Sequence, residues 1–176
     1  MSDWLIKYYQ EPERYPVSAK GLHQLLMDAN LSIYDWGMIP GTDQTLGGCA
    51  GTVAWIYQQT LFIFHSGDTV AFLIRDQQAS QLTRLHEMNG ALFNFFGLGP
   101  NLKVEPEQRQ LQEFDMILLF SDGVSKVYHP IEAADVIVNE MEDHDDISRA
   151  AKELARLSRA RGSPDDITVL LIEKEE

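Results

Sequence analysis

The sequence predicts an α+β fold built in layers, with mostly antiparallel strands. Apolar residues recur at helical spacing near the start of the chain, from about Ser18 to Tyr34. Runs of β-type residues separated by short turns follow, and two further helical segments precede a last apolar run. Because strands joined by tight turns pair antiparallel, we expect sheets whose faces are covered by the helices.

One apolar run, Met116–Phe120, stands out because the polar residues Ser121, Asp122 and Gly123 end it abruptly. Such a run is typical of a strand that is buried on both faces. Asp122 would then lie where a core strand leaves the core, held rigidly and within reach of solvent, which suits metal binding or catalysis. Asp-Gly is also a common turn dipeptide, so the motif alone leaves an ordinary turn open.

The first third of the chain is expected to be helical and then irregular. Residues 2–14 are predicted to form a short helix that Pro12 and Pro16 end. A second helix is predicted from about Ser18, a candidate N-cap, to Tyr34. The stretch 37–51 is rich in Gly and Thr, which indicates a loop.

The middle of the chain is expected to form a meander of strands. The predicted strands cover residues 51–58, 60–66, 69–75 and, for a short fourth, 81–85, with turns near 58–59 and 77–78. Residues 89–100 are punctuated by glycine and rich in aromatic residues, which indicates a packed loop. Residues 102–111 alternate weakly and are predicted to form a strand or hairpin arm.

The last third is expected to hold two helices and a final strand. Pro130 would lie in the first turn of one helix, and the other would run from about Asp146 to Arg161, with Gly162 at the C′ position. The acidic segment 140–146 between them is predicted to be a solvated loop. A turn at 163–166 then leads into a buried strand at 167–172.

Composition limits the class of protein. The 176 residues are 44% hydrophobic, which is enough for one domain with a real core. With 27 acidic and 14 basic residues, the net charge of -13 argues against nucleic acid and anionic membranes as partners, but is compatible with divalent cations. Cys49 is the only cysteine, which excludes an internal disulfide. Without a signal-peptide pattern or a long apolar run, we expect a soluble cytoplasmic protein.

Three places in the chain share one pattern, an apolar β-type run that meets an acidic turn. They are Ser66-Gly67-Asp68, Ser121-Asp122-Gly123 and Asp165-Asp166. Carboxylates at strand ends can converge in space, and carboxylate oxygens are the ligands that Mg²⁺ and Mn²⁺ prefer. Each is an ordinary turn aspartate when taken singly, but together they predict a metal site.

From about Gly48 onward, these motifs resemble the later two-thirds of a PPM-type, or type 2C, metal-dependent Ser/Thr protein phosphatase. The resemblance is carried by Gly-Thr-Val-Ala at 51–54, Ser-Gly-Asp-Thr at 66–69, Phe-Ser-Asp-Gly-Val at 120–124 and Pro-Asp-Asp-Ile-Thr at 164–168. It implies a β-sandwich of two antiparallel sheets flanked by helix pairs. Residues 1–176 would form a single domain, with a helical part at about 1–36 and the best-matching part at 48–176.

The same resemblance implies the site. Asp122 and Asp165 would be metal ligands for Mn²⁺ or Mg²⁺, and Asp68 would serve an additional, weaker metal site. The residues that would shape the site are Gly67, Ser121, Gly123 and Asp166. No catalytic residue is assigned.

The resemblance stops short at the N-terminal side. The family's first metal-binding motifs are an acidic segment and an Asp-Gly-His/Met-Gly-Gly loop that bridges two ions, and neither has a match, nor has the family's phosphate-binding arginine. We therefore expect a weak, incomplete site in an N-terminally incomplete sandwich. An incomplete sandwich leaves a sheet edge exposed, which invites a homodimer or a regulatory protein partner.

Two functions follow from this resemblance. One is the hydrolysis of phosphoserine or phosphothreonine in a phosphoprotein substrate. The alternative is a catalytically impaired pseudophosphatase, or a truncated phosphatase-like scaffold, that binds a protein partner.

His65 lies just before the Ser66-Gly67-Asp68 motif. It could approach a metal site, but we favour a strand residue that faces solvent or is satisfied by a hydrogen bond.

Overall fold

The computed structural model describes residues 6, 10, 18–42, 45–104 and 106–175. Its helices are α2 (Ala19–Gly37), the 3₁₀ turn η1 (Gly99–Asn101), α3 (Asp122–Ser125), α4 (Pro130–His144) and α5 (Ile147–Ala160). Its strands are β1 (Gly51–Tyr57), β2 (Thr60–Ser66), β3 (Val70–Arg75), β4 (Gln78–Gln81), β5 (Glu87–Met88), β6 (Ala91–Leu92), β7 (Glu107–Gln110), β8 (Met116–Phe120) and β9 (Val169–Glu173).

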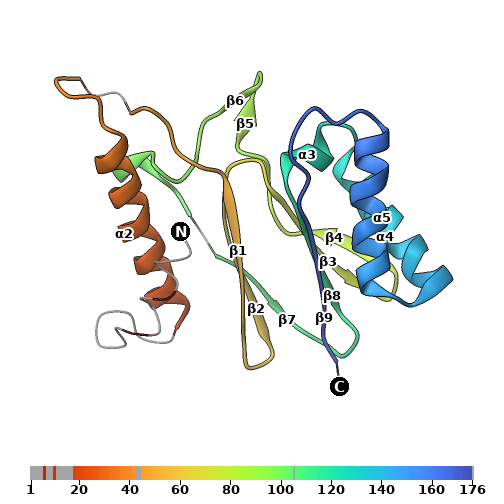
Figure 1. The fold of residues 1–176 in the computed structure, drawn as a ribbon. Coiled ribbons are helices and arrows are strands. Elements are labelled where there is room, and N and C mark those ends of the chain that lie inside the picture. Colours follow the sequence, from red (N-terminus) through yellow and green to blue (C-terminus); the bar gives the residue numbers. More distant parts are fainter. Residues whose placement is uncertain (1–5, 7–9, 11–17, 43–44, 105, 176) are drawn as a thin grey trace.

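The main strands form two antiparallel sheets that face each other (Figure 1). One sheet has the order β1-β2-β7 and the other β4-β3-β8-β9, while β5 and β6 form a small separate hairpin. Helix α2 lies outside the first sheet, and the α4–α5 pair lies outside the second (Figure 1). The layered α+β sandwich is therefore confirmed. The helix predicted over residues 2–14 lies outside the described residues, apart from positions 6 and 10.

Three apolar clusters hold the four layers together. Leu22, Leu25 and Leu26 of α2 pack on the first sheet, and α4 and α5 pack on the second. Between the sheets lies a third cluster, made of Leu61, Ile63, Ala71, Leu73, Leu111 and Ile117. The apolar strands β2, β3 and β8 thus have cores on both faces of their sheets.

Strand β8 has the bounds that its apolar run predicts. Its residues alternate between two cores: Ile117 belongs to the cluster between the sheets, whereas Leu118 and Phe120 belong to the cluster under α4 and α5. The prediction of a strand buried on both faces is confirmed.

Helix α2 begins as predicted, because the Ser18 side chain accepts a hydrogen bond from the Gly21 backbone N–H at 3.0 Å. It ends at Gly37, three residues beyond the predicted Tyr34. Inside the helix, the buried Asn30 side chain donates to the Gly99 carbonyl at 2.7 Å and accepts from the Gly97 N–H at 2.8 Å. These bonds hold the glycine-punctuated segment 89–100 against α2.

The β3–β4 turn lies one residue earlier than predicted. Asp76 and Gln77 take positive φ values of 48° and 63°, as the two central residues of a tight hairpin do. Strand β4 consequently begins at Gln78 and ends at Gln81, so the predicted strand over residues 81–85 is wrong.

The predicted acidic loop at 140–146 is also wrong, since α4 continues to His144. Acidic side chains on the solvent face do not interrupt a helix whose other face is packed, and Ile137 and Met141 pack against the core here. The break comes at Asp145, which has a positive φ of 48°, and Asp146 then N-caps α5 by accepting from the Arg149 N–H at 2.9 Å.

Strand β9 is the end strand of its sheet among the described strands. It begins two residues later than predicted, because the first residue of β9 that pairs with β8 is Val169, opposite Phe120. Leu170 is 49% exposed, which is high for a strand leucine. No helix in the described part of the chain is long and apolar enough to cross a membrane.

Candidate metal-binding site

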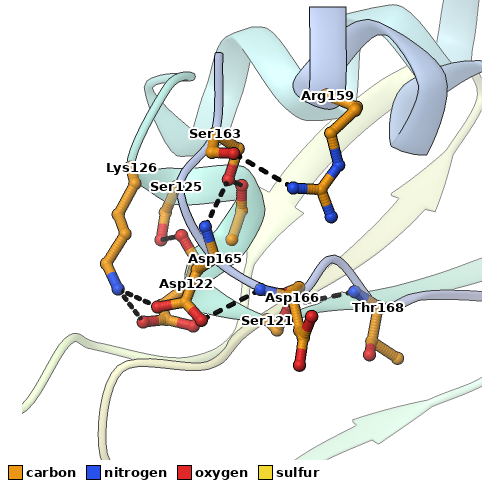
Figure 2. A network of polar contacts seen from close by, with 10 residues as sticks. Ser121, Asp122, Ser125, Lys126, Arg159, Ser163, Asp165, Asp166 and Thr168 are labelled. Carbon is orange, nitrogen blue, oxygen red and sulfur yellow. Dashed lines mark hydrogen bonds and ion pairs between the residues drawn. The ribbon is translucent and has the colours of Figure 1, made fainter. Parts of the chain in front are cut away.

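The pairing of β8 with β9 brings the Ser121-Asp122-Gly123 and Asp165-Asp166 motifs together (Figure 2). The ladder continues one step beyond its last pair, since the Ser121 N–H donates to the Thr168 carbonyl at 3.0 Å. The Thr168 N–H returns a bond to the Ser121 hydroxyl, also at 3.0 Å. Two motifs that are far apart in the sequence thus share one end of the sheet.

Gly123 is required by a close approach rather than by a positive φ. A Cβ atom on this residue would lie 2.2 Å from the Asp166 carbonyl oxygen, which no real side chain allows. The same carbonyl accepts a hydrogen bond from the Ser121 hydroxyl at 3.1 Å. Asp166 therefore contacts the Ser121-Asp122-Gly123 motif through its backbone carbonyl, while its own side chain is exposed.

Ser163 links the Asp165-Asp166 motif to Gly123 through hydrogen bonds. Its buried hydroxyl donates to the Gly123 carbonyl at 2.6 Å and accepts a longer bond from the Asp165 N–H at 3.4 Å. Arg159 of α5 donates to the Ser163 carbonyl at 3.1 Å. From the sequence, Ser163 is predicted only to lie in a turn. Its hydrogen-bond partner, the Gly123 carbonyl, belongs to a motif far away in the sequence, so no local pattern indicates the contact.

Lys126 is the residue that sequence reasoning missed. Asp122 is the first residue of the single-turn helix α3, and the Lys126 side chain extends back along this turn to place Nζ 2.6 Å from Asp122 Oδ2. The same ammonium group forms an ion pair and hydrogen bond with Asp165 Oδ2 (Figure 2). The available signal was the i,i+4 spacing of Asp122 and Lys126, which has meaning only if the segment is helical.

The electrostatics of this cluster follow from these contacts. The hydrogen bonds to Asp122 and Asp165 raise the pKa of Lys126, so the ammonium group stays charged. The hydrogen bond from Lys126 lowers the pKa of the Asp165 carboxyl group. One positive charge therefore lies between two carboxylates.

Asp68 lies in the β2–β3 turn, close enough to Asp122 to be influenced by its charge. Burial, and then the negative charge of Asp122, raises the pKa of the Asp68 carboxyl group. Gly67 makes this turn possible: its φ is 113°, and a Cβ atom would lie 2.3 Å from Ala50 Cβ. The structure thus brings Asp122 and Asp165 into one network of contacts and places Asp68 within electrostatic range of it.

The donor set fits one hard divalent cation, because Asp122 and Asp165 present carboxylate oxygens from two rigidly joined motifs. Asp122 and Asp165 by themselves offer few carboxylate oxygens for two ions held close together. Within residues 18–42, 45–104 and 106–175, no three His, Cys, Asp or Glu side chains gather in a way that could hold a metal ion.

His65 is a satisfied core histidine rather than a member of this cluster. Its Nε2 bonds the Arg84 carbonyl at 2.9 Å, so this nitrogen carries the proton, and Nδ1 lies 2.9 Å from the Thr52 hydroxyl, which donates to it. Burial lowers the pKa of the ring to about 4, so it is neutral at neutral pH. Of the two alternatives that we favoured for His65, exposure to solvent or a ring satisfied by hydrogen bonds, the structure shows the second.

The architecture is that of known bacterial Ser/Thr phosphatases. The Mycobacterium tuberculosis serine/threonine phosphatase PstP/Ppp is similar with a TM-score of 0.78 at 19% identity, covering 99% of this chain and 81% of that one. PppA, described as a key regulatory component of T6SS in Pseudomonas aeruginosa, is similar with a TM-score of 0.74 at 20% identity, covering 93% and 75%. The PstP catalytic domain in complex with two manganese ions gives a TM-score of 0.74 at 18% identity, covering 99% and 80%.

The family follows from the sequence profile described as Stage II sporulation protein E (SpoIIE), which matches residues 49–175. The chain belongs to this family, and the predicted resemblance to PPM-type phosphatases is confirmed. No curated protein matches the chain.

Proposed function

We propose that this protein is a metal-dependent phosphatase that hydrolyses phosphoserine or phosphothreonine in proteins. The observation that carries the proposal is the meeting of Asp122 and Asp165 at one end of the β8–β9 pair. The family and the fold of Ser/Thr phosphatases support it, as does the manganese complex of the similar PstP domain. In this proposal residues 1–176 act as a single cytoplasmic domain.

The chain's own residues would divide the work as follows. Asp122 and Asp165 would hold one Mn²⁺ or Mg²⁺, and Asp68 would contribute to a weaker site beside it. Ser121, Gly123 and the Asp166 backbone would keep the two ligands in register, and Gly67 would position Asp68. A bound ion would neutralise charge on the phosphoryl oxygens and lower the pKa of a bound water.

The test is Mn²⁺-dependent hydrolysis of p-nitrophenyl phosphate and of a phosphothreonine peptide. The wild-type protein is expected to be active with Mn²⁺ and inactive with a chelator. Asp122→Ala should reduce activity to background because it removes a ligand, whereas Asp143→Ala, which changes an exposed carboxylate of α4, should leave activity unchanged. Equal activity in both variants would contradict the proposal.

A second candidate function is a catalytically impaired scaffold that binds a protein partner. The observation that favours it is the Lys126 ammonium group, which pairs with both candidate ligands. A wild-type protein without hydrolysis at saturating Mn²⁺, and with no change on Asp122→Ala, would select the scaffold over the enzyme.

Association is a further part of the proposal. The outer edge of β9 has no neighbouring strand among those described, and its exposed backbone groups are suited to pair with a strand of a second copy or of a regulatory protein.

A further inference from the structure

The Lys126 side chain lies where a cation shared by Asp122 and Asp165 would bind. Its Nζ is 2.6 Å from Asp122 Oδ2 and pairs with Asp165 Oδ2 at the same time. Figure 2 shows the ammonium group reaching both carboxylates from one side. Both carboxylates thus direct an oxygen at a single positive charge.

This arrangement is built into the backbone. Lys126 follows Asp122 by one helical turn, and its N–H donates to the Asp122 carbonyl at 2.9 Å. Asp165 is fixed independently, by the bond from its N–H to Ser163 and by its Oδ1, which accepts from the Asp166 N–H at 2.9 Å. The side chain of Lys126 therefore needs no rearrangement of its neighbours to reach both carboxylates.

We propose that Lys126 is a tethered cation that competes with the divalent metal ion for Asp122 and Asp165 and so sets the metal affinity of the site. This inference rests on the proposed metal site. An ion that binds both carboxylates has to break two charge-assisted hydrogen bonds and then lie close to a displaced ammonium group of the same sign. Lys126 is 43% exposed, so it has room to swing into solvent when the ion enters.

Without metal, the Lys126 ammonium group would neutralise part of the negative charge of Asp122 and Asp165. A tethered group has a high effective concentration, so it stays in place when free Mn²⁺ or Mg²⁺ is scarce. Metal would then bind only when its concentration is high enough to displace the lysine. Lys126 would thus determine the metal concentration at which the site fills.

The test is a titration of the purified protein with Mn²⁺, with free Mn²⁺ measured by electron paramagnetic resonance. Lys126→Met should bind Mn²⁺ more tightly than the wild-type protein, by about three- to tenfold, since it removes the competing charge and keeps a side chain of similar length. Lys126→Arg, which keeps the charge, should bind as weakly as the wild-type protein. Lys152→Met removes an exposed lysine of α5 and controls for the change in net charge.

The double variant Lys126→Met/Asp122→Asn should lose the gain, which assigns the bound ion to this site. Equal Mn²⁺ affinity in wild-type, Lys126→Met and Lys152→Met proteins would overturn the role of Lys126 while leaving the metal site intact. No Mn²⁺ binding in any folded variant, with folding checked by circular dichroism, would overturn both the inference and the proposed site.

Discussion

At the scale of single residues, Gly123 shows why glycine follows the aspartate of the central motif. The Asp166 carbonyl oxygen occupies the space that a side chain would need, because it would lie 2.2 Å from a Cβ atom on Gly123. We expect Gly123→Ala to lower the free energy of unfolding by about 1–3 kcal/mol, because two motifs would have to separate. Urea unfolding followed by fluorescence measures the change.

The matched control is Gly51→Ala at the start of β1. A Cβ atom there would lie 3.5 Å from the nearest atom, in the Phe96 ring, which is an ordinary contact. We expect a change within about 0.5 kcal/mol. If both variants unfold at the same urea concentration, the close approach of Asp166 does not limit this position.

A second residue-scale prediction concerns pH. Burial lowers the pKa of His65 to about 4, below the ordinary value of 6.5. Between these two pH values, the unfolded chain binds a proton that the folded protein does not. Stability is therefore present above pH 6.5 and is lost as the pH falls toward 4, by up to about 3 kcal/mol. His86, whose pKa is also lowered by burial, acts in the same direction.

Urea unfolding at several pH values between 7 and 4 would measure this loss. His65→Gln removes the titrating ring, so its stability should vary less with pH than that of the wild-type protein over this interval. Profiles of equal slope would show that protonation of His65 does not destabilise the fold.

The sequence could predict Asp122, Asp165 and Asp68 as residues at strand ends, because the transition from an apolar run to an acidic turn is a local signal. It could not predict Lys126. That residue lies beside the carboxylates only because the motif begins a helical turn and because β9 brings Asp165 to the same place. Contacts of this kind depend on tertiary structure.

At the scale of elements, the strand patterns were more informative than the turns between them. The bounds of β2 and β8 match their apolar runs, whereas the β3–β4 turn is displaced by one residue. Helix α4 is longer than predicted because charge marks exposure, not loop structure, when the opposite face of the helix is apolar.

The prediction at the scale of elements concerns the outer edge of β9, which has no neighbouring strand in the part of the chain that the structure describes. We expect the wild-type protein to self-associate or to bind a partner through this edge, and Leu170→Lys to weaken the association, because a charge on an edge strand opposes pairing. Light scattering coupled to size-exclusion chromatography would measure the mass. Leu31→Lys, at a leucine of α2 that is 41% exposed, is the control. A wild-type protein that stays monomeric at high concentration would contradict a homodimer.

At the scale of the whole molecule, the sequence predicts the layers because the runs that form β2, β3 and β8 are apolar enough for two buried faces. It does not predict which sheet each strand joins, since β2 pairs with β1 and β7 while β3 pairs with β4 and β8. The candidate site depends on that choice: Asp122 and Asp165 meet only because β8 and β9 are neighbours.

The pairing of β8 with β9 also has a consequence for how the protein is made. Strand β9 is separated from β8 along the chain by all of α3, α4 and α5. During synthesis, Asp122 leaves the ribosome well before Asp165, and the two carboxylates meet only after this long loop closes. An ion that needs both carboxylates therefore cannot bind before Asp165 has been synthesised and β9 has paired with β8.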